Sequence, residues 1–183
     1  MHICVYCASS IRIPQVYIET ARALGTGLAQ HGWSLVYGGG SVGLMGVIAE
    51  AVHAAGGRVV GVIPQGLLDR ELGYLAADDL IVTTTLRERK QIMEDRADVF
   101  IALPGGFGTF EELLEMITLR QLGYHNKPIF VLNTANYYSD LLAQFERCFE
   151  EGFAGPIYRE MYQVVDSVEM VIDMLEYIAD ENA

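Results

Sequence analysis

The segment from Leu103 to Glu112, LPGGFGTFEE, combines residue types that could bind an anion and act on a substrate beside it. Gly105, Gly106 and Gly108 permit positive φ angles, so successive backbone N–H groups could converge on an anion as a nest. Thr109 could cap the helix that follows, or donate its hydroxyl to a phosphate oxygen. The segment therefore predicts an anion site at the start of a helix.

The glutamates that end this segment have a structural and a functional interpretation. With Thr109 as the N-cap, Glu112 falls at the third helical position, where a capping box would explain it without any substrate. A capping box needs no glycines before the cap, and each glycine costs about 1 kcal/mol relative to alanine. We therefore favour function. Because a helix N-terminus stabilises negative charge, we expect Glu112 to stay ionised near pH 7, able to stabilise a cation or activate water.

A second glycine-rich segment, YGGGSVGLMG, begins at Tyr37 and also connects an expected strand to an expected helix. Its glycines satisfy G-x-G-x-x-G, a dinucleotide fingerprint in which the backbone approaches a phosphate closely. NAD binding would also need a carboxylate at the end of the next strand, which here ends VIPQG, and no Walker A lysine follows. Gly39 and Gly40 remain candidate contacts for a phosphorylated ligand, and a purely structural turn is an equal alternative.

Residues 86–93, LRERKQIM, contain three of the twelve basic residues of the chain. A solvated helix face is the ordinary explanation for such a run. Alternatively, this helix begins at the ligand-binding edge of a sheet and Arg89 points inward. Its planar guanidinium would then bind a phosphate or orient Glu112. The residues by themselves leave both alternatives open.

Short apolar runs rich in valine and isoleucine alternate with helical patterns along the chain. We expect strands at 2–7, 34–37, 58–63, 79–83, 99–103, 128–133 and 162–166, and helices at 14–31, 43–55, 86–96, 109–122, 138–150 and 167–178. Strands this apolar are usually covered on both faces, as in a parallel sheet with crossover helices. The pattern predicts a single Rossmann-like α/β domain over residues 1–183, with a doubly wound, mostly parallel sheet flanked by helices. Ligands should bind at the carboxyl ends of its strands.

Composition and charge exclude several classes of function. A chain of 183 residues with 51% hydrophobic content suits one domain with a sizeable core. The net charge of −12 argues against nucleic-acid binding, but not against a small phosphorylated ligand held by backbone N–H groups. No apolar run reaches the length of a membrane span, and the start MHICVYCASS lacks the pattern of a signal peptide. We therefore expect a cytoplasmic protein without membrane contact.

The cysteines and histidines do not indicate a metal or redox site. Cys4 and Cys7 have the C-x-x-C spacing, but in an expected strand they point to opposite faces. We interpret them as buried reduced thiols. The four histidines have no metal-ligand spacing, so no metal site is expected.

The glycine-rich and basic segments together resemble those of the LOG family, the cytokinin riboside 5′-monophosphate phosphoribohydrolases, which are often mislabelled as lysine decarboxylases. The family hallmark P-G-G-x-G-T-x-x-E is complete at residues 104–112, and Arg89 and Lys90 match the end of a second motif, M-H-x-R-K. Leu86 and Arg87 depart from the Met-His of that motif, which leaves the base preference open. VYCASS and YGGGSVGLMG also look like family segments, so the likeness extends over nearly the whole chain.

The resemblance implies hydrolysis of the N-glycosidic bond of a nucleoside 5′-monophosphate, such as AMP or isopentenyladenosine monophosphate, without a cofactor. The products would be the free base and ribose 5-phosphate. Glu112 and Arg89 would be the catalytic pair, and the chain would form a homodimer, as family members commonly do. The substrate-binding residues implied by the resemblance are Glu71, Lys90, Gly105, Gly106, Phe107, Gly108, Thr109 and Thr118.

Three other functions make different predictions. A pyridoxal-phosphate decarboxylase needs a lysine for its Schiff base, and the only lysines are Lys90 and Lys127, which precedes Pro128 at a strand entrance. An NAD oxidoreductase would need a carboxylate for the ribose at the end of the strand at 58–63, and the chain has none there. A non-catalytic nucleotide sensor would bind AMP through the same loops without releasing the base.

Overall fold

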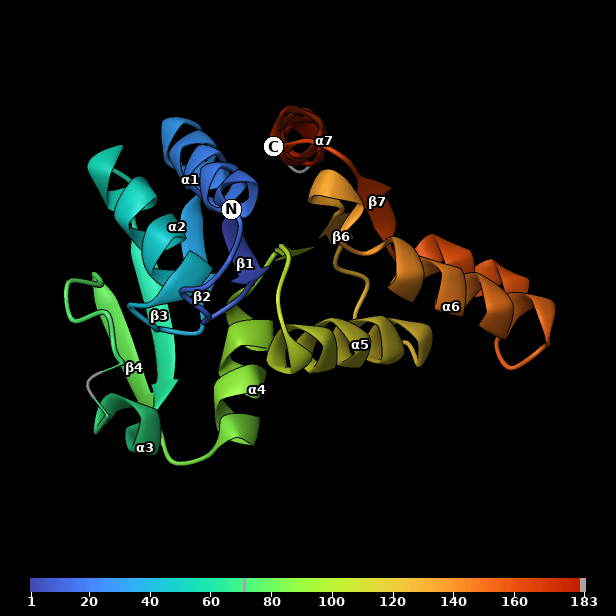
Figure 1. Ribbon diagram of the computed structural model, residues 1–183, viewed down its shortest axis with the longest axis horizontal. Coiled ribbons are helices and arrows are strands. Elements are labelled where there is room, and N and C mark those ends of the chain that lie inside the picture. The colour runs from blue at the N-terminus through green and yellow to red at the C-terminus, as the bar shows by residue number, and fades with distance from the viewer. Residues whose placement is uncertain (71, 182–183) are drawn as a thin grey trace.

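The computed structural model describes residues 1–70 and 72–181, and within them seven strands form one sheet (Figure 1). The strands are β1 His2–Tyr6, β2 Ser34–Tyr37, β3 Val59–Pro64, β4 Asp79–Thr83, β5 Val99–Ala102, β6 Ile129–Leu132 and β7 Gln163–Val165. The helices are α1 Gln15–Gln30, α2 Gly43–Ala54, α3 Gln65–Leu68, α4 Leu86–Arg96, α5 Phe107–Gln121, α6 Ser139–Glu150 and α7 Val168–Glu181, with the 3₁₀ helices η1 Thr134–Asn136 and η2 Pro156–Met161.

The strand order is β4-β3-β2-β1-β5-β6-β7, and each neighbouring pair is parallel. The chain moves outward from β1 to β4, then returns to the other side of β1 to place β5. The predicted doubly wound, mostly parallel α/β sheet is therefore confirmed. Because the strand order reverses between β1 and β5, the loops that follow these two strands border the crevice where such sheets bind ligands.

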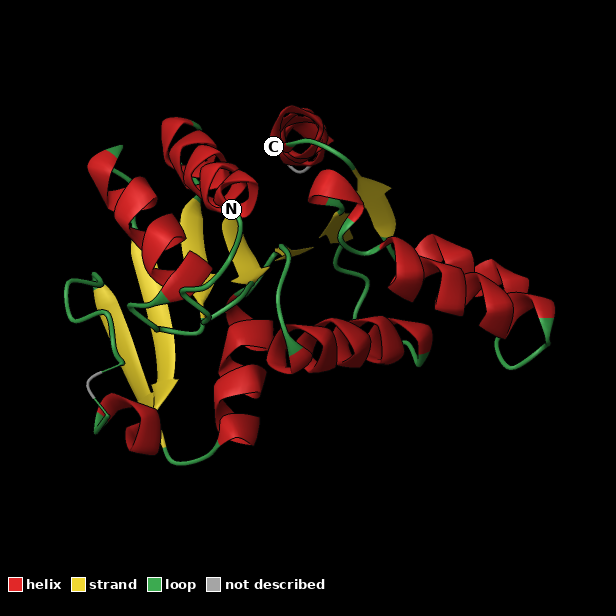
Figure 2. Ribbon diagram, viewed as in Figure 1, coloured by secondary structure: helices red, strands yellow, loops and turns green. Residues whose placement is uncertain are grey.

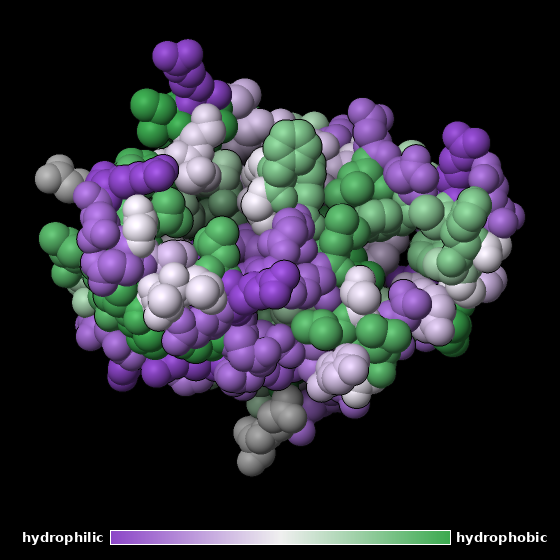
Figure 3. All heavy atoms as spheres, turned by 90° about the horizontal axis from the view of Figure 1, so that it is seen from below, coloured by the Kyte–Doolittle hydropathy of each residue, from purple (hydrophilic) through white to green (hydrophobic). Residues whose placement is uncertain are grey.

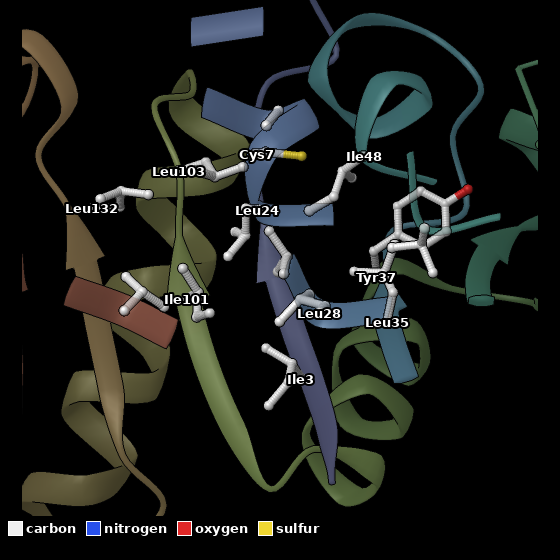
Figure 4. Close-up of a cluster of buried hydrophobic side chains, with 14 of the residues drawn as sticks. Ile3, Cys7, Leu24, Leu28, Leu35, Tyr37, Ile48, Ile101, Leu103 and Leu132 are labelled. Atoms are coloured by element: carbon white, nitrogen blue, oxygen red, sulfur yellow. The ribbon is translucent and has the colours of Figure 1, made fainter. Parts of the chain in front are cut away.

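Two apolar cores, one on each face, explain why the strands are apolar throughout. Ile3 and Val5 of β1 pack in the core beneath α1, α2 and α7, and Figure 4 shows this cluster with Leu24 and Ile48 from the covering helices. Cys4 and Tyr6 point the other way, into the core with α4 and α5. The helices thus lie on both faces of the sheet (Figure 2).

The expectation for the cysteines is also confirmed. Cys4 and Cys7 belong to opposite cores, and both are buried free thiols. Among the described residues, no group of three or more His, Cys, Asp or Glu side chains could hold a metal ion. The same residues include no helix with the length and apolar character of a membrane span.

Three short elements were not predicted, namely α3, η1 and η2. They have three to six residues each, which is too few to show a helical period. Most predicted boundaries differ from the observed ones by one to three residues, and the difference that matters for the site is at α5, which begins at Phe107 rather than at 109. This shift of two residues changes the interpretation of the site.

Candidate functional site

A pocket of about 290 Å³ lies at the carboxyl edge of the sheet, beside the predicted crevice. Three groups of residues line it: those after β1 (Cys7, Ala8, Ser9), those at the second glycine-rich corner and along α2 to α4 (Gly38, Gly40, Val42, Met45, Ile63, Leu67, Leu72, Arg89), and those at the start of α5 (Gly106, Phe107, Gly108, Thr109, Glu112). The loops after β1 and β5 meet here because these strands are neighbours at the reversal of strand order.

The start of α5 offers this pocket free backbone donors. Gly106 is the N-cap, with φ −94° and ψ −156°, and no side chain caps the helix. The first N–H groups of a helix have no partner within the helix. Within the described part of the chain, no other carbonyl or side chain accepts from the N–H of Phe107, Gly108 or Thr109. The helix dipole adds partial positive charge here, so this end of the pocket suits an anion.

The predicted capping box is wrong. Thr109 is the third residue of α5 rather than its cap, and Glu112 lies in the second turn. The predicted nest is wrong too, since Gly105, Gly106 and Gly108 have no positive φ. Gly105 is required instead by close approach, because a Cβ there would lie 2.0 Å from the hydroxyl oxygen of Thr109. The loop therefore folds tightly against the helix, which starts early and presents its N–H groups directly.

In the other glycine-rich segment, residues 37–46, the start of the helix has a structural role. The N–H groups of Leu44 and Met45 donate to the carbonyl of Ala8 at 2.9 and 3.4 Å, so the N-terminus of α2 already has an acceptor. Gly43 has φ +63°, and a Cβ there would collide with the backbone of the β1 loop. Gly39 does not line the pocket, whereas Gly40 does. At the start of α5, in contrast, the N–H groups of Phe107, Gly108 and Thr109 have no acceptor among the described residues.

Arg89 points inward, which decides between the two alternatives for the basic segment. Its Nη2 lies 3.1 Å from Oε1 of Glu112, and both side chains are largely buried. Gly38 makes room for it, since a Cβ at that position would lie 2.1 Å from the same nitrogen. The buried Nε of Arg89 has no hydrogen-bond partner among the described residues. The guanidinium therefore keeps one unused donor beside the carboxylate.

Burial changes the protonation of Glu112. The side chain is buried, and the loss of hydration raises the pKa of its carboxyl group from 4.5 to about 7, although the Arg89 guanidinium acts to lower it. Desolvation disfavours the charged form more than the nearby positive charge favours it. The expectation that Glu112 is fully ionised near pH 7 is therefore wrong. Its protonated form is populated there as well as the carboxylate.

The pocket wall away from α5 is apolar and was missed by sequence reasoning. Met45, Ile63, Leu67 and Leu72 come from α2, β3, α3 and the loop after α3. Each lies in a different element, so no local pattern connects them. An apolar wall of this kind suits a nucleobase. Cys7 also lines the pocket, but burial raises the pKa of its thiol well above the usual range, so it is not a thiolate nucleophile.

Several predicted contacts lie elsewhere. Lys90 pairs with Glu111 and, at 2.9 Å, with Glu115 in a surface groove between α4 and α5. Thr118 is exposed and donates its hydroxyl to the carbonyl of Leu114 at 2.7 Å. Gly105 belongs to the loop before α5 but lines a neighbouring hollow rather than this pocket. Glu71 lies outside the described residues.

Known proteins resemble this chain over most of its length. A family described as "Possible lysine decarboxylase" matches residues 45–175. The cytokinin riboside 5′-monophosphate phosphoribohydrolase LOG3 of Arabidopsis thaliana is 43% identical over 177 residues, which cover 97% of this chain and 82% of that protein. LOG1 from the same plant is 44% identical over 174 residues, or 95% of this chain and 82% of its own. The chain belongs to the LOG family.

The solved structures with this fold include two proteins named for another ligand. The molybdenum cofactor binding protein of Rippkaea orientalis matches with a TM-score of 0.75 and 25% identity, covering 97% of this chain and 96% of that one. The molybdenum cofactor carrier protein of Chlamydomonas reinhardtii matches with a TM-score of 0.73 and 26% identity, covering 98% of both chains.

Both lysines of the chain lie outside the pocket, which bears on the decarboxylase description. Lys90 is held by the two glutamates named above, and Lys127 donates from Nζ to the carbonyl of Glu94 at 2.6 Å. A Schiff base in this pocket would need a lysine there. The hallmark of the LOG family, in contrast, forms the loop and first turns of α5.

We expect Gly108→Ala to separate folding from ligand binding. A Cβ at Gly108 would meet no atom within 4 Å, and alanine is favoured over glycine in a helix, so stability should be kept or rise by about 0.5–1 kcal/mol. The added methyl group would narrow the end of the pocket that presents free N–H groups. The KM for a nucleoside monophosphate should therefore rise at least tenfold. Thermal melting and steady-state kinetics measure the two effects, with Gly66→Ala in α3, also in open space, as the control.

Proposed function

We propose that this protein hydrolyses the N-glycosidic bond of adenosine 5′-monophosphates, including N6-modified ones, to give the free base and ribose 5-phosphate. One observation carries the proposal: the unpaired N-terminus of α5 and the buried Glu112–Arg89 pair border the same pocket. An anion-binding end next to a carboxylate fits a phosphorylated sugar. The names of the LOG relatives support the same reaction.

The spacing along α5 suits this substrate. Thr109 and Glu112 are three residues apart, so their side chains lie on one face of the helix, about 4.5 Å apart along its axis. We assign the 5′-phosphate to the N–H groups of Gly106, Phe107, Gly108 and Thr109, with the Thr109 hydroxyl as a further donor. The ribose would then extend toward Glu112, and the base toward the apolar wall at Leu67 and Leu72.

In the proposed reaction the bond between the anomeric carbon and the base nitrogen breaks, and its electron pair leaves with the base. The sugar acquires positive charge, as in glycoside hydrolysis. Water then adds to the anomeric carbon and gives up a proton, and the departing base nitrogen takes up one. Ionised Glu112 stabilises that charge or positions the water, and Arg89 orients the carboxylate and contacts the substrate. Charge that develops only in the transition state is the kind that a fixed carboxylate stabilises selectively.

The pKa of Glu112 leads to a pH dependence. If the ionised form is active, kcat/KM should rise tenfold per pH unit below pH 7 and become constant above it, because the folded enzyme loses this proton at a pKa of about 7. Rates of base release measured from pH 5 to 9 test this expectation. A rate that instead falls above pH 7 would assign Glu112 as a proton donor.

The direct test compares two substrates. The protein is incubated with AMP and with isopentenyladenosine monophosphate, and the free base released from each is quantified by chromatography. Release from either substrate supports hydrolysis, and the ratio gives the base preference. The carrier proteins with this fold favour a second candidate, nucleotide binding without turnover. That candidate predicts saturable AMP binding in calorimetry with no base released.

We also propose that the chain forms a homodimer through the surface of α4 and α5. Exposed apolar side chains on this side of the molecule include Leu86, Leu114, Leu122 and Tyr124. Figure 3 views this side, where hydrophobic residues lie interspersed with hydrophilic ones. Light scattering coupled to size-exclusion chromatography should give twice the chain mass of 20.2 kDa. A mass equal to one chain would contradict the proposal.

A further inference from the structure

Three hydrogen bonds fix the backbone carbonyls of the loop that precedes α5. The carbonyl of Leu103 accepts from the hydroxyl of Tyr138 at 2.7 Å, and the carbonyl of Pro104 accepts from the N–H of Ala8 at 3.3 Å. The carbonyl of Gly105 accepts from the hydroxyl of Tyr137. Three consecutive carbonyls are therefore fixed, and two of the donors are side chains from a single segment after β6.

That segment has an uncommon backbone. Ala135 and Asn136 both have positive φ, 52° and 61°, although neither is glycine. Consecutive left-handed residues of this kind are unfavourable, and such strain concentrates at functional sites. The side-chain oxygen of Asn133 accepts from the N–H of Tyr138 at 2.7 Å and holds the turn. The turn places Tyr137 and Tyr138 edge to face, with ring centroids 5.1 Å apart, behind the loop.

The geometry of the peptide group connects Tyr137 to the pocket. The carbonyl of Gly105 and the N–H of Gly106 belong to one planar trans peptide, so they point in opposite directions. Tyr137 binds that carbonyl from a small apolar hollow of about 240 Å³, which it lines with Tyr17 and Gly105. Gly106 lines both this hollow and the substrate pocket. Fixing the carbonyl on the Tyr137 side therefore turns the N–H of Gly106 toward the pocket.

We propose that Tyr137 is a positioning residue for the phosphate subsite, acting through the Gly105–Gly106 peptide. The inference rests on the proposed function, because it assigns the substrate phosphate to these N–H groups. Tyr138 has a different role. It fixes the carbonyl of Leu103, whose peptide continues into Pro104 and carries no N–H. The hydroxyl of Tyr138 therefore supports the strand end, and that of Tyr137 supports the ligand.

Tyr137→Phe removes the hydroxyl and keeps the ring. Tyr137 is 38% exposed, so the variant should fold with an unchanged melting temperature. The loss of one neutral hydrogen bond should raise the KM for AMP and the dissociation constant of ribose 5-phosphate by the same factor, about three- to tenfold. Turnover at saturating AMP should change less than twofold, and inhibition by free adenine should not change. Calorimetry with ribose 5-phosphate gives a readout that is independent of catalysis.

Two further variants distinguish positioning from a general loss of structure. Tyr138→Phe should lower the melting temperature, since the buried carbonyl of Leu103 loses its donor. It should weaken the binding of ribose 5-phosphate less than Tyr137→Phe does. Tyr177→Phe is the control. Among the described contacts, the hydroxyl of Tyr177 bonds only to Glu181 on the surface of α7, at 2.6 Å, so this variant should match the parent protein. The proposal would be overturned if Tyr137→Phe bound ribose 5-phosphate with unchanged affinity, or if its affinity for adenine fell by the same factor as its affinity for ribose 5-phosphate.

The two proposals fail in different ways. If the parent protein releases no base from AMP or from isopentenyladenosine monophosphate, the hydrolytic function is refuted, while calorimetry with ribose 5-phosphate still tests Tyr137. If the parent protein is active and Tyr137→Phe binds ribose 5-phosphate as tightly as the parent does, only the role of Tyr137 is refuted.

Discussion

Replacement of Glu112 by glutamine is expected to lower the turnover of AMP by about 10²- to 10⁴-fold, the range typical of a group that acts directly on the reacting atoms. The amide has nearly the same shape as the carboxyl group and keeps a partner for Arg89, but it carries no negative charge to stabilise the sugar cation. The binding of ribose 5-phosphate should change little, because the start of α5, not Glu112, is the proposed phosphate subsite. Chromatography of released adenine measures the first effect and calorimetry the second.

The control for this variant is Glu151→Gln, which removes a glutamate that pairs with Arg147 at 2.7 Å on the surface of α6. It should have normal turnover. A Glu112→Gln protein that folds and keeps near-normal turnover would refute the catalytic assignment. The raised pKa of Glu112 does not weaken the test, since both proteins can also be compared at a more alkaline pH, where more of the native carboxyl group is ionised.

The same variant should be more stable than the parent protein at alkaline pH. The folded pKa of Glu112, about 7, lies above its ordinary value of 4.5, so between these values the unfolded chain has lost a proton that the folded protein keeps. The unfolded state then binds fewer protons, and stability falls as the pH rises through this window. The loss amounts to about 3 kcal/mol, and glutamine, which resembles the protonated form, avoids it. Denaturant unfolding at pH 4.5 and pH 8 should show no gain at the lower pH and a gain at the higher.

Arg89→Ala is the second change with a large expected effect. It leaves the buried carboxylate of Glu112 without its 3.1 Å partner, so the pKa of Glu112 should rise further and less of the active form should exist at pH 7. Together with the lost contact to substrate, we expect about a 10²-fold decrease in kcat/KM at pH 7. The rising part of the pH–rate profile should move to higher pH, so part of the loss should be recovered at pH 9.

Gly38→Ala provides an independent route to the same state. Its Cβ would lie 2.1 Å from Nη2 of Arg89, so the guanidinium must move away from Glu112. The displaced profile of Arg89→Ala should therefore reappear in Gly38→Ala. Arg96→Ala is the control, because Arg96 is also on α4 but pairs with Asp79 at 3.0 Å outside the pocket. A pH profile of Arg89→Ala that coincides with that of the parent protein would contradict a role through the carboxylate.

The sequence by itself determined the architecture and the chemical core of the site. Apolar strands alternating with helical patterns are typical of a parallel sheet covered on both faces, and the sheet has that form because the central strands place successive side chains in opposite cores. The segment at residues 104–112 lies at the carboxyl end of β5, where this topology opens a crevice, so Glu112 and the glycines before it could be located from their order alone.

Only the tertiary structure decided which donors are free and which charges are buried. The two glycine-rich corners look alike in sequence, yet the carbonyl of Ala8 occupies the start of α2 and leaves the start of α5 open. Local pattern predicted a capping box and an ionised Glu112, but the approach of Gly105 to Thr109 begins the helix earlier, and burial raises the pKa of the carboxyl group. The inward course of Arg89 depends on Gly38, which is fifty-one positions away in the chain, and contacts of that kind form only when distant segments pack.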